Sequence, residues 1–320
     1  MSSSGGTGGT RAIIAAFLAN LGIAIAKFLG FLFTGSSSML AESIHSVADT
    51  GNQGLLLLGG KRAQREATPE HPFGFGRERY FWSFIVAVVL FLLGGVFALF
   101  EGYEKVTHPH EIESAPVAIV ILLLAIVAEG LSFRTALRES ADERHGRSLF
   151  TYIRRSKSPE FPVVILEDFA ALTGLALALA ALGTALVTGN ARWDGVGTLC
   201  IGVLLVVVAV VLAVEMKSLL IGESASAEVQ RHITAAIEGD DHVNRVIHLR
   251  TEHLGPDELL VGVKVAFAPT LDVATLAGAI DRVEAAVRDK VPSVRLLYVE
   301  PDLDRSAADA AEATARNPTR

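Results

Sequence analysis

The chain has 320 residues, of which 51% are hydrophobic, and its mean hydropathy is +0.44. Both values are high for a globular protein, and the apolar residues gather in long uncharged blocks before residue 220, as is typical of a membrane protein. The net charge of −7, with no basic patch among aromatic residues, gives no indication of nucleic-acid binding, so no nucleic-acid partner is expected.

The first residues, "MSSSGGTGGTR", lack the charged region and the cleavage site of a signal peptide and predict a disordered tail over residues 1–11. Six apolar segments follow, and each has about the 20 residues that a helix needs to cross a bilayer. They lie at residues 12–34, 38–60, 80–101, 115–136, 161–187 and 195–215. The sequence therefore predicts an α-helical membrane protein with six transmembrane helices within residues 12–216.

Loop charge predicts the direction of these spans. The loops after the second and fourth spans carry most of the basic residues: Lys61, Arg62, Arg65, Arg77, Arg79, Arg134, Arg138, Arg144, Arg147, Arg154, Arg155 and Lys157. The opposite loops carry Lys105 and Arg192. Because basic loops stay on the cytoplasmic side, both termini are expected in the cytoplasm. Arg outnumbers Lys and Ala is abundant, which favours a bacterial protein and hence the bacterial plasma membrane.

The composition changes after residue 216 and predicts a cytoplasmic domain over residues 217–303. Two segments have helical patterns and three have strand patterns, at residues 226–239, 245–253, 259–267, 272–290 and 294–300. The order αββαβ is typical of a small α+β domain with a sheet covered on one face. Residues 304–320 are expected to be a disordered tail.

The second span contains His45 and Asp49. A charge at the centre of a span costs about 2.5–3.5 kcal/mol, so such residues are rare and usually functional. Their spacing of four puts both on one helix face, where two ligands can bind one metal ion. Asn52 extends this polar stripe. The alternative is a structural polar pair that is hydrogen-bonded to a neighbouring helix.

The fifth span contains Glu167 and Asp168 near its cytoplasmic end. Adjacent residues lie about 100° apart on a helix, so only one can point directly at a given partner, and the other acts from the side or supports a ligand. Two neighbouring carboxylates in apolar surroundings repel unless a cation or a proton lies between them. The alternative is an acid pair that is merely solvated at the membrane interface.

Together, the second and fifth spans offer four candidate metal ligands: His45, Asp49, Glu167 and Asp168. A mixed set of nitrogen and oxygen donors suits tetrahedral Zn²⁺, with Mn²⁺, Fe²⁺ or Co²⁺ as alternatives. Ca²⁺ and Mg²⁺ fit less well, because they prefer more oxygens and no imidazole. The histidines of the soluble domain have no tight ligand spacing, so a second metal site there stays open.

Three stretches carry a family resemblance: "AKFLGFLFTGSSSMLAESIHSVADTGNQ" (26–53), "HPFGFGRERYFW" (71–82) and the acidic motif of the fifth span. Followed by the αββαβ domain, they resemble the cation diffusion facilitator family over roughly residues 12–302. The resemblance implies a homodimer whose six spans cross the lipid bilayer, with cytoplasmic termini and a cytoplasmic, ferredoxin-like C-terminal domain that dimerises. It also implies export of divalent transition metals, chiefly Zn²⁺, in exchange for protons, with no resident cofactor and no enzymatic activity.

The resemblance carries over to particular residues. His45 and Asp49 match the ligand pair of the family's second span. The family's fifth span usually has HxxxD; here Asp168 matches the Asp, but Val164 occupies the His position and cannot bind metal. "LEDFAALTG" (166–174) resembles the zinc transporter nine-like branch, which has a Glu-Asp pair there. Whether Glu167 or Asp168 is the main ligand stays open.

These features predict a divalent cation/proton antiporter that works by alternating access around a site near the membrane midplane. An intramembrane metal-dependent hydrolase is one alternative, although the chain has no HExxH motif. A metal sensor that does not transport is the other. Transport of metal ions would favour the antiporter, hydrolysis the metallohydrolase, and metal binding without transport the sensor.

Overall fold

The structure is a computed structural model that describes residues 37–109, 115–144 and 148–304, together with Gly146 and scattered positions between 14 and 32. The expected tail over residues 1–11, most of the first span and residues 305–320 lie outside the described residues. The chain divides into two compact units, Met1–Leu220 and Ile221–Arg320.

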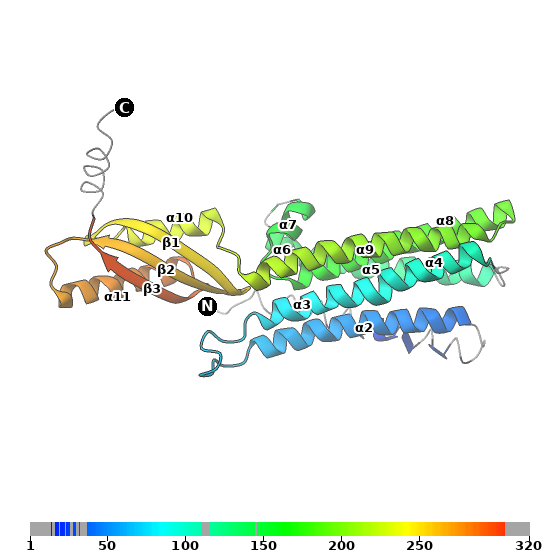
Figure 1. The fold of residues 1–320 in the computed structure, drawn as a ribbon, viewed down its shortest axis with the longest axis horizontal. Helices are drawn as coiled ribbons and strands as arrows, with labels where there is room; N and C mark the ends of the chain where they lie inside the picture. Colours follow the sequence, from blue (N-terminus) through cyan, green and yellow to red (C-terminus); the bar gives the residue numbers. More distant parts are fainter. Residues whose placement is uncertain are drawn as a thin grey trace, which may run out of the picture. The chain divides into compact units, whose positions relative to one another are not determined.

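Long helices make up the described part of the first unit (Figure 1). They are α2 (Ser37–Ala63), α3 (Glu78–Val89), a π-helical stretch η1 (Leu90–Val96), α4 (Phe97–Thr107), α5 (Ala115–Glu139), α8 (Glu160–Thr188) and α9 (Arg192–Ile221), with the short α6 (Ala141–Arg144) and α7 (Leu149–Arg155) between α5 and α8. The segments α3, η1 and α4 form one continuous helix, Glu78–Thr107. Gly189 ends α8, because its φ of +64° is a left-handed conformation that glycine adopts readily.

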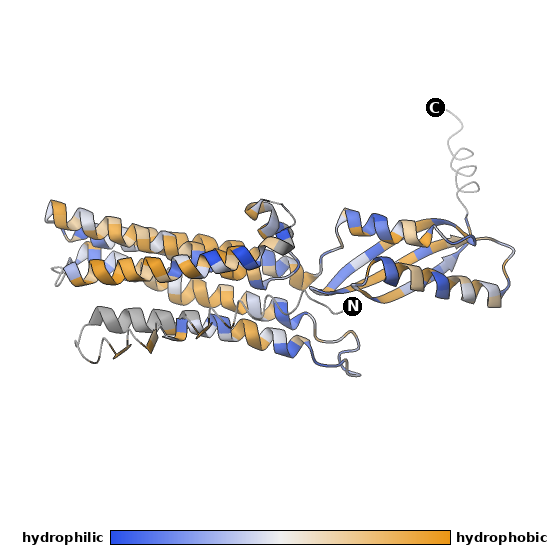
Figure 2. Cartoon of the chain, turned by 180° about the vertical axis from the view of Figure 1, so that it is seen from behind, coloured by the Kyte–Doolittle hydropathy of each residue, from blue (hydrophilic) through white to orange (hydrophobic). Residues whose placement is uncertain are grey.

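Four helices in the described residues are long and apolar enough to cross a membrane: Glu78–Thr107, Ala115–Glu139, Glu160–Thr188 and Arg192–Ile221. They correspond to the predicted third to sixth spans, and Figure 2 shows how strongly hydrophobic residues dominate them. Helix α2 has the length of a span, but polar residues such as His45, Asp49, Asn52 and Gln53 dilute its hydropathy. The full number of six spans stays a prediction.

Glycines bring the helix Glu78–Thr107 and α9 into close backbone contact. A Cβ added to Gly102 would lie 2.7 Å from the backbone nitrogen of Leu199, and one added to Gly202 would lie 2.8 Å from that of Leu99. Small residues at such positions let membrane helices approach closely, where packing holds them together. The two helices therefore form a tightly packed pair.

The second unit has the predicted order αββαβ: α10 (Ala227–Ile237), β1 (Val243–Gly255), β2 (Glu258–Phe267), α11 (Val273–Lys290) and β3 (Val294–Asp302). The sheet order is β1-β2-β3, antiparallel between β1 and β2 and parallel between β2 and β3. Side chains of Ser226 and Asp272 cap the first turns of α10 and α11.

The core of this unit lies between β2 and the two helices. The predicted alternation in β2 is confirmed, since Val261, Val263, Val265 and Phe267 are all buried. They pack with apolar side chains of both helices, among them Ile233, Ile237, Ala279, Val283 and Val287. The helices α10 and α11 also contact each other, so the sheet carries both on the same face.

Candidate metal centre

The acid pair of the fifth span lies in the first half of α8 and is buried. Only 8% of Glu167 and 5% of Asp168 is exposed, and the preceding residues Val163, Val164 and Ile165 are buried as well. The interpretation of a solvated interfacial pair is therefore wrong. Buried carboxylates need hydrogen-bond donors or a cation to offset the loss of water.

Glu167 points toward α2. The side-chain nitrogen of Asn52 donates to Glu167 Oε1 at 2.9 Å, and the side-chain nitrogen of Gln53 donates to Glu167 Oε2 at 3.2 Å. Both amides are almost fully buried, with 2% of Asn52 and 1% of Gln53 exposed. Each oxygen of this carboxylate thus accepts a hydrogen bond from α2.

Asp168 points toward a different helix. Ser132 of α5 donates its hydroxyl to Asp168 Oδ2 at 3.0 Å. This divergence follows from the rotation of about 100° between adjacent helical residues. The two carboxylates therefore connect α8 with two neighbours, Glu167 with α2 and Asp168 with α5.

His45 and Asp49 lie in α2, but their side chains are outside the described part of the structure. Helical spacing alone places their positions on a face. Successive residues are rotated by about 100° around the helix axis. Around the axis of α2, the position of Asp49 is therefore about 10° from the direction midway between Asn52 and Gln53, and that of His45 is about 30° from it. Since those two amides bind Glu167, the positions of His45 and Asp49 lie on the face of α2 that meets α8.

The structure thus brings Glu167 and Asp168 together with α2 and α5, and it leaves the contact of these acids with His45 and Asp49 untested. Among the residues that the structure describes, no three His, Cys, Asp or Glu side chains form a group that could hold a metal ion. Sequence reasoning missed Gln53 and Ser132. Gln53 follows Asp49 by four residues, a spacing that could have revealed it, whereas a single Ser in an apolar span gives no signal.

A partly buried ion pair lies at the start of α8. Arg79 Nε contacts Glu160 Oε1 at 2.5 Å, and only 6% of Glu160 is exposed. Glu160 precedes Glu167 by seven residues, so the two lie two turns apart on one face. Arg79 belongs to the stretch "HPFGFGRERYFW" and thus ties α3 to the beginning of the helix that carries the acid pair.

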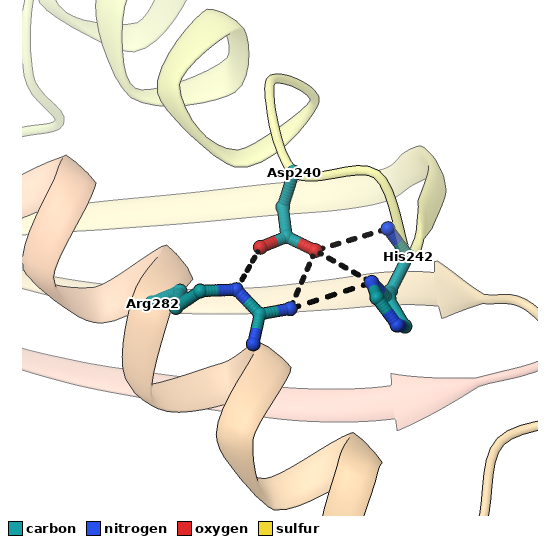
Figure 3. A network of polar contacts seen from close by, with 3 residues as sticks. All are labelled: Asp240, His242 and Arg282. Carbon is teal, nitrogen blue, oxygen red and sulfur yellow. Dashed lines mark hydrogen bonds and ion pairs between the residues drawn. The ribbon is translucent and has the colours of Figure 1, made fainter.

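The second unit contains a polar network that joins α11 to the turn between α10 and β1 (Figure 3). Arg282 of α11 donates to Asp240 at 2.7 and 3.2 Å, and its nitrogen Nη2 lies 3.3 Å from His242 Nδ1. The hydrogen bond from Arg282 holds the pKa of Asp240 below its ordinary value, with a smaller contribution from the backbone N–H of His242. The network fixes the turn after α10 against α11.

A family model described as the cation efflux transmembrane domain matches residues 13–221. The chain belongs to the cation efflux family. This confirms the resemblance to the cation diffusion facilitators. The family's members are transporters, not enzymes, which agrees with the expectation for this member.

Named relatives refine the position within the family. The proton-coupled zinc antiporter SLC30A9, mitochondrial, of Mus musculus is 35% identical over 244 residues, which cover 75% of this chain and 43% of the mouse protein. Metal tolerance protein C4 of Arabidopsis thaliana is 30% identical over 260 residues, covering 80% of this chain and 57% of the plant protein. The chain thus spans less than two thirds of either relative. The mouse protein confirms the predicted branch of the family.

A solved structure of the MamM C-terminal domain, residues 215–293, is 28% identical; the match covers 24% of this chain and 95% of that chain, with a TM-score of 0.23.

The chain is an integral membrane protein, as expected. The mouse relative is mitochondrial by name and the other relative is a plant protein, so neither supports the expected bacterial plasma membrane.

Proposed function

We propose that this family member is a divalent transition-metal cation/proton antiporter that exports Zn²⁺, with Mn²⁺, Fe²⁺ and Co²⁺ as the alternative ions. The observation that carries this proposal is the buried pair Glu167 and Asp168 in a mostly apolar helix, bonded from two neighbouring helices. Ionisable residues inside a membrane are costly and are retained at ion pathways. The name of the mouse relative, a proton-coupled zinc antiporter, supports the choice of ion and counter-ion.

The proposed site takes His45 and Asp49 from α2 and Glu167 and Asp168 from α8. A divalent cation between these helices would offset the charge of the carboxylates, which is otherwise expensive to bury. Imidazole nitrogen and carboxylate oxygen together match the donors that Zn²⁺ prefers. The ion is cargo, so its binding must be strong enough for capture and weak enough for release.

Proton exchange follows from competition for the same lone pairs. Carboxylates and imidazole bind metal only in their deprotonated forms, so metal binding and protonation exclude each other. His45 suits this exchange because an imidazole ordinarily titrates near neutral pH. In alternating access, the site loads from the cytoplasm, turns to the other side, and releases the ion as protons bind.

We also propose the arrangement of the whole chain in the membrane. Six spans within residues 12–216, with the basic loops inside, put both termini in the cytoplasm. The domain over residues 217–303 then lies in the cytoplasm and forms a homodimer, and residues 1–11 and 304–320 are tails. Composition alone favours the bacterial plasma membrane.

The test is metal uptake by the full chain in proteoliposomes of inside-out orientation under a pH gradient. We expect Asp49→Ala and Asp168→Ala each to lower Zn²⁺ uptake by about a hundredfold or more, since ligands contribute at least as much as their supporting groups. Thr184→Val in α8 is the control, because its hydroxyl donates to the backbone oxygen of Ala180 within the same helix. Wild-type uptake in both alanine variants would show that the proposed site is wrong.

The same preparation separates the rival functions. Hydrolysis of an added ester or peptide without Zn²⁺ flux would favour the metallohydrolase. Zn²⁺ binding without flux would favour the sensor. Competition among Zn²⁺, Mn²⁺, Fe²⁺, Co²⁺ and Cd²⁺ at two pH values would then rank the ions.

A further inference from the structure

The amides of Asn52 and Gln53 are only half satisfied. Each donates its NH₂ group to a different oxygen of Glu167. Their carbonyl oxygens, Asn52 Oδ1 and Gln53 Oε1, are buried and accept no hydrogen bond from any residue that the structure describes. Two consecutive residues of α2 thus present two unpartnered oxygens beside a buried carboxylate.

Such oxygens are costly in a protein interior. A buried acceptor without a partner keeps the full cost of its lost hydration, and native proteins contain few of them. Both amides are at least 98% buried, so exposure to solvent or lipid headgroups does not relieve the cost. An oxygen that binds a cation is expected to lack a hydrogen-bond donor in the protein, because the cation is its partner.

Glu167 makes both amides better ligands. A carboxylate that accepts from an amide NH₂ group polarises the amide and draws negative charge toward its oxygen, since linked hydrogen bonds strengthen one another. Metal ligands are commonly held by a carboxylate in this way, which also fixes their orientation. The double contact of Glu167 with Asn52 and Gln53 fits this supporting role.

The amides also lie at the right place along α2. Asn52 follows Asp49 by three residues and Gln53 follows it by four, so they lie about one turn, or 5 Å, further along the same face. His45 lies a further turn away, about 10 Å from Asn52 along the axis. Of the two proposed ligand positions in α2, that of Asp49 is therefore the nearer to the amides.

We propose that Asn52 and Gln53 are oxygen ligands of the transported cation and that Glu167 is a positioning residue that holds and polarises their amides. This rests on the proposed function and deepens it. Asp168, which points away from Glu167, remains the direct ligand from α8. With two neutral oxygens added, the site accommodates ions that prefer more than four ligands, so Mn²⁺ joins Zn²⁺ as a substrate.

Paired substitutions separate an oxygen ligand from a hydrogen-bond donor. Asn52→Asp and Gln53→Glu keep an oxygen at the same place and remove the NH₂ group, whereas Asn52→Leu and Gln53→Met keep only the shape. For the full chain in proteoliposomes, we expect Leu and Met to raise the KM for Zn²⁺ and Mn²⁺ about tenfold or more, as losing a ligand weakens binding. Asp and Glu lose the contact with Glu167 but retain an oxygen, so their KM should stay clearly below that of the Leu and Met variants, and the maximal rate should change little in all four.

Equal losses in the Leu and Asp variants would overturn the proposal, because they would show that only the NH₂ donor matters. A lower maximal rate at unchanged KM in the Leu and Met variants would also overturn it, since a merely structural role has that effect. Where either Asn52 variant fails to fold, the Gln53 pair carries the same comparison.

A spectroscopic readout is independent of transport. Tetrahedral Co²⁺ absorbs visible light more strongly than Co²⁺ with more ligands, so Co²⁺ bound to the wild-type chain should absorb weakly. Asn52→Leu should strengthen this absorption, and Thr184→Val should not. Strong absorption already in the wild-type chain would contradict the added ligands.

The variant Asp168→Ala distinguishes the two levels of failure. If Asp168→Ala and Asp49→Ala transport like wild type, the proposed transport site itself is wrong. If both lose uptake while Asn52→Leu and Gln53→Met keep the wild-type KM, only the amide ligands are refuted, and water satisfies the two oxygens instead.

Discussion

At the scale of single residues, the acid pair of α8 consists of two groups with different surroundings. Glu167 is bonded by two amides of α2, and Asp168 is bonded by the hydroxyl of Ser132 in α5. The two amides hold both oxygens of Glu167 beside α2, which suits a residue that positions those amides. We therefore keep Asp168 as the proposed direct ligand and Glu167 as the proposed supporting residue.

That assignment predicts unequal effects of two isosteric variants. Glu167→Gln replaces one accepting oxygen by an NH₂ group, which then faces an NH₂ group of α2. Because this breaks one of the two supporting hydrogen bonds, we expect the KM for Zn²⁺ to rise about tenfold at a similar maximal rate. Asp168→Asn removes a charged ligand and should lower uptake far more. Initial rates over a range of Zn²⁺ concentrations measure both, and a larger loss in Glu167→Gln would reverse the assignment.

At the scale of elements, the contact between the helix Glu78–Thr107 and α9 depends on glycine. A Cβ at Gly202 would lie 2.8 Å from backbone and side-chain atoms of Leu99, which is closer than real Cβ atoms approach. Because the neighbour includes backbone, the helices must separate to make room. Steric size at this contact therefore controls how the two helices pack.

We expect Gly202→Leu to destabilise the membrane unit by about 1–3 kcal/mol, the usual cost of overpacking. Gly183→Leu in α8 is the matched control, because nothing lies within 4 Å of a Cβ added there. Thermal unfolding in detergent should give a lower midpoint for Gly202→Leu and little change for the control. Equal midpoints would show that the close approach does not contribute to stability.

The network of Asp240 and Arg282 predicts a pH dependence of the second unit. Arg282 lowers the pKa of Asp240 in the folded state, so the pair stabilises the fold fully above the ordinary aspartate pKa of about 3.9 and loses this effect as the pH falls through the lowered value. Arg282→Gln should therefore lower stability at pH 7 and reduce its further loss in acid.

Hydrogen exchange of the turn between α10 and β1, followed from pH 7 to pH 3 in the full chain, measures this effect. Arg288→Gln is the control, because Arg288 forms an exposed pair with Glu284 of the same helix. Similar pH profiles for Arg282→Gln and wild type would exclude a stabilising role for the pair.

At the scale of the whole molecule, the chain consists of an apolar helical unit and a separate α+β unit. Only the helical unit contains the proposed transport site. A cation that binds the folded state stabilises it by mass action, so an ion added at about 100 times its Kd should stabilise the protein by about 2.7 kcal/mol.

We therefore expect Zn²⁺ to raise the unfolding temperature of the wild-type chain in detergent and Mg²⁺ to leave it unchanged. Asp168→Asn should abolish the rise, and addition of a chelator should reverse it. A rise of the same size in Asp168→Asn would place the bound ion outside the proposed site.

The sequence by itself determined the features that depend on local patterns. Long apolar runs predicted the four described spans, and periodicity predicted the αββαβ order of the second unit, because hydropathy and side-chain alternation act over a few residues. The acidic motif with Glu167 and Asp168 was also visible, since charges are rare in apolar runs and are often functional there.

Only the tertiary structure decided the neighbours of these residues. The rotation of each helix about its axis, set by packing, turns Glu167 toward α2 and Asp168 toward α5. The same packing brings Arg79 to Glu160 and buries Gln53 beside Glu167, although 81 and 114 residues separate them along the chain. Such contacts leave no trace in a single sequence, because which faces of two helices meet is a property of the assembled helices and not of either one.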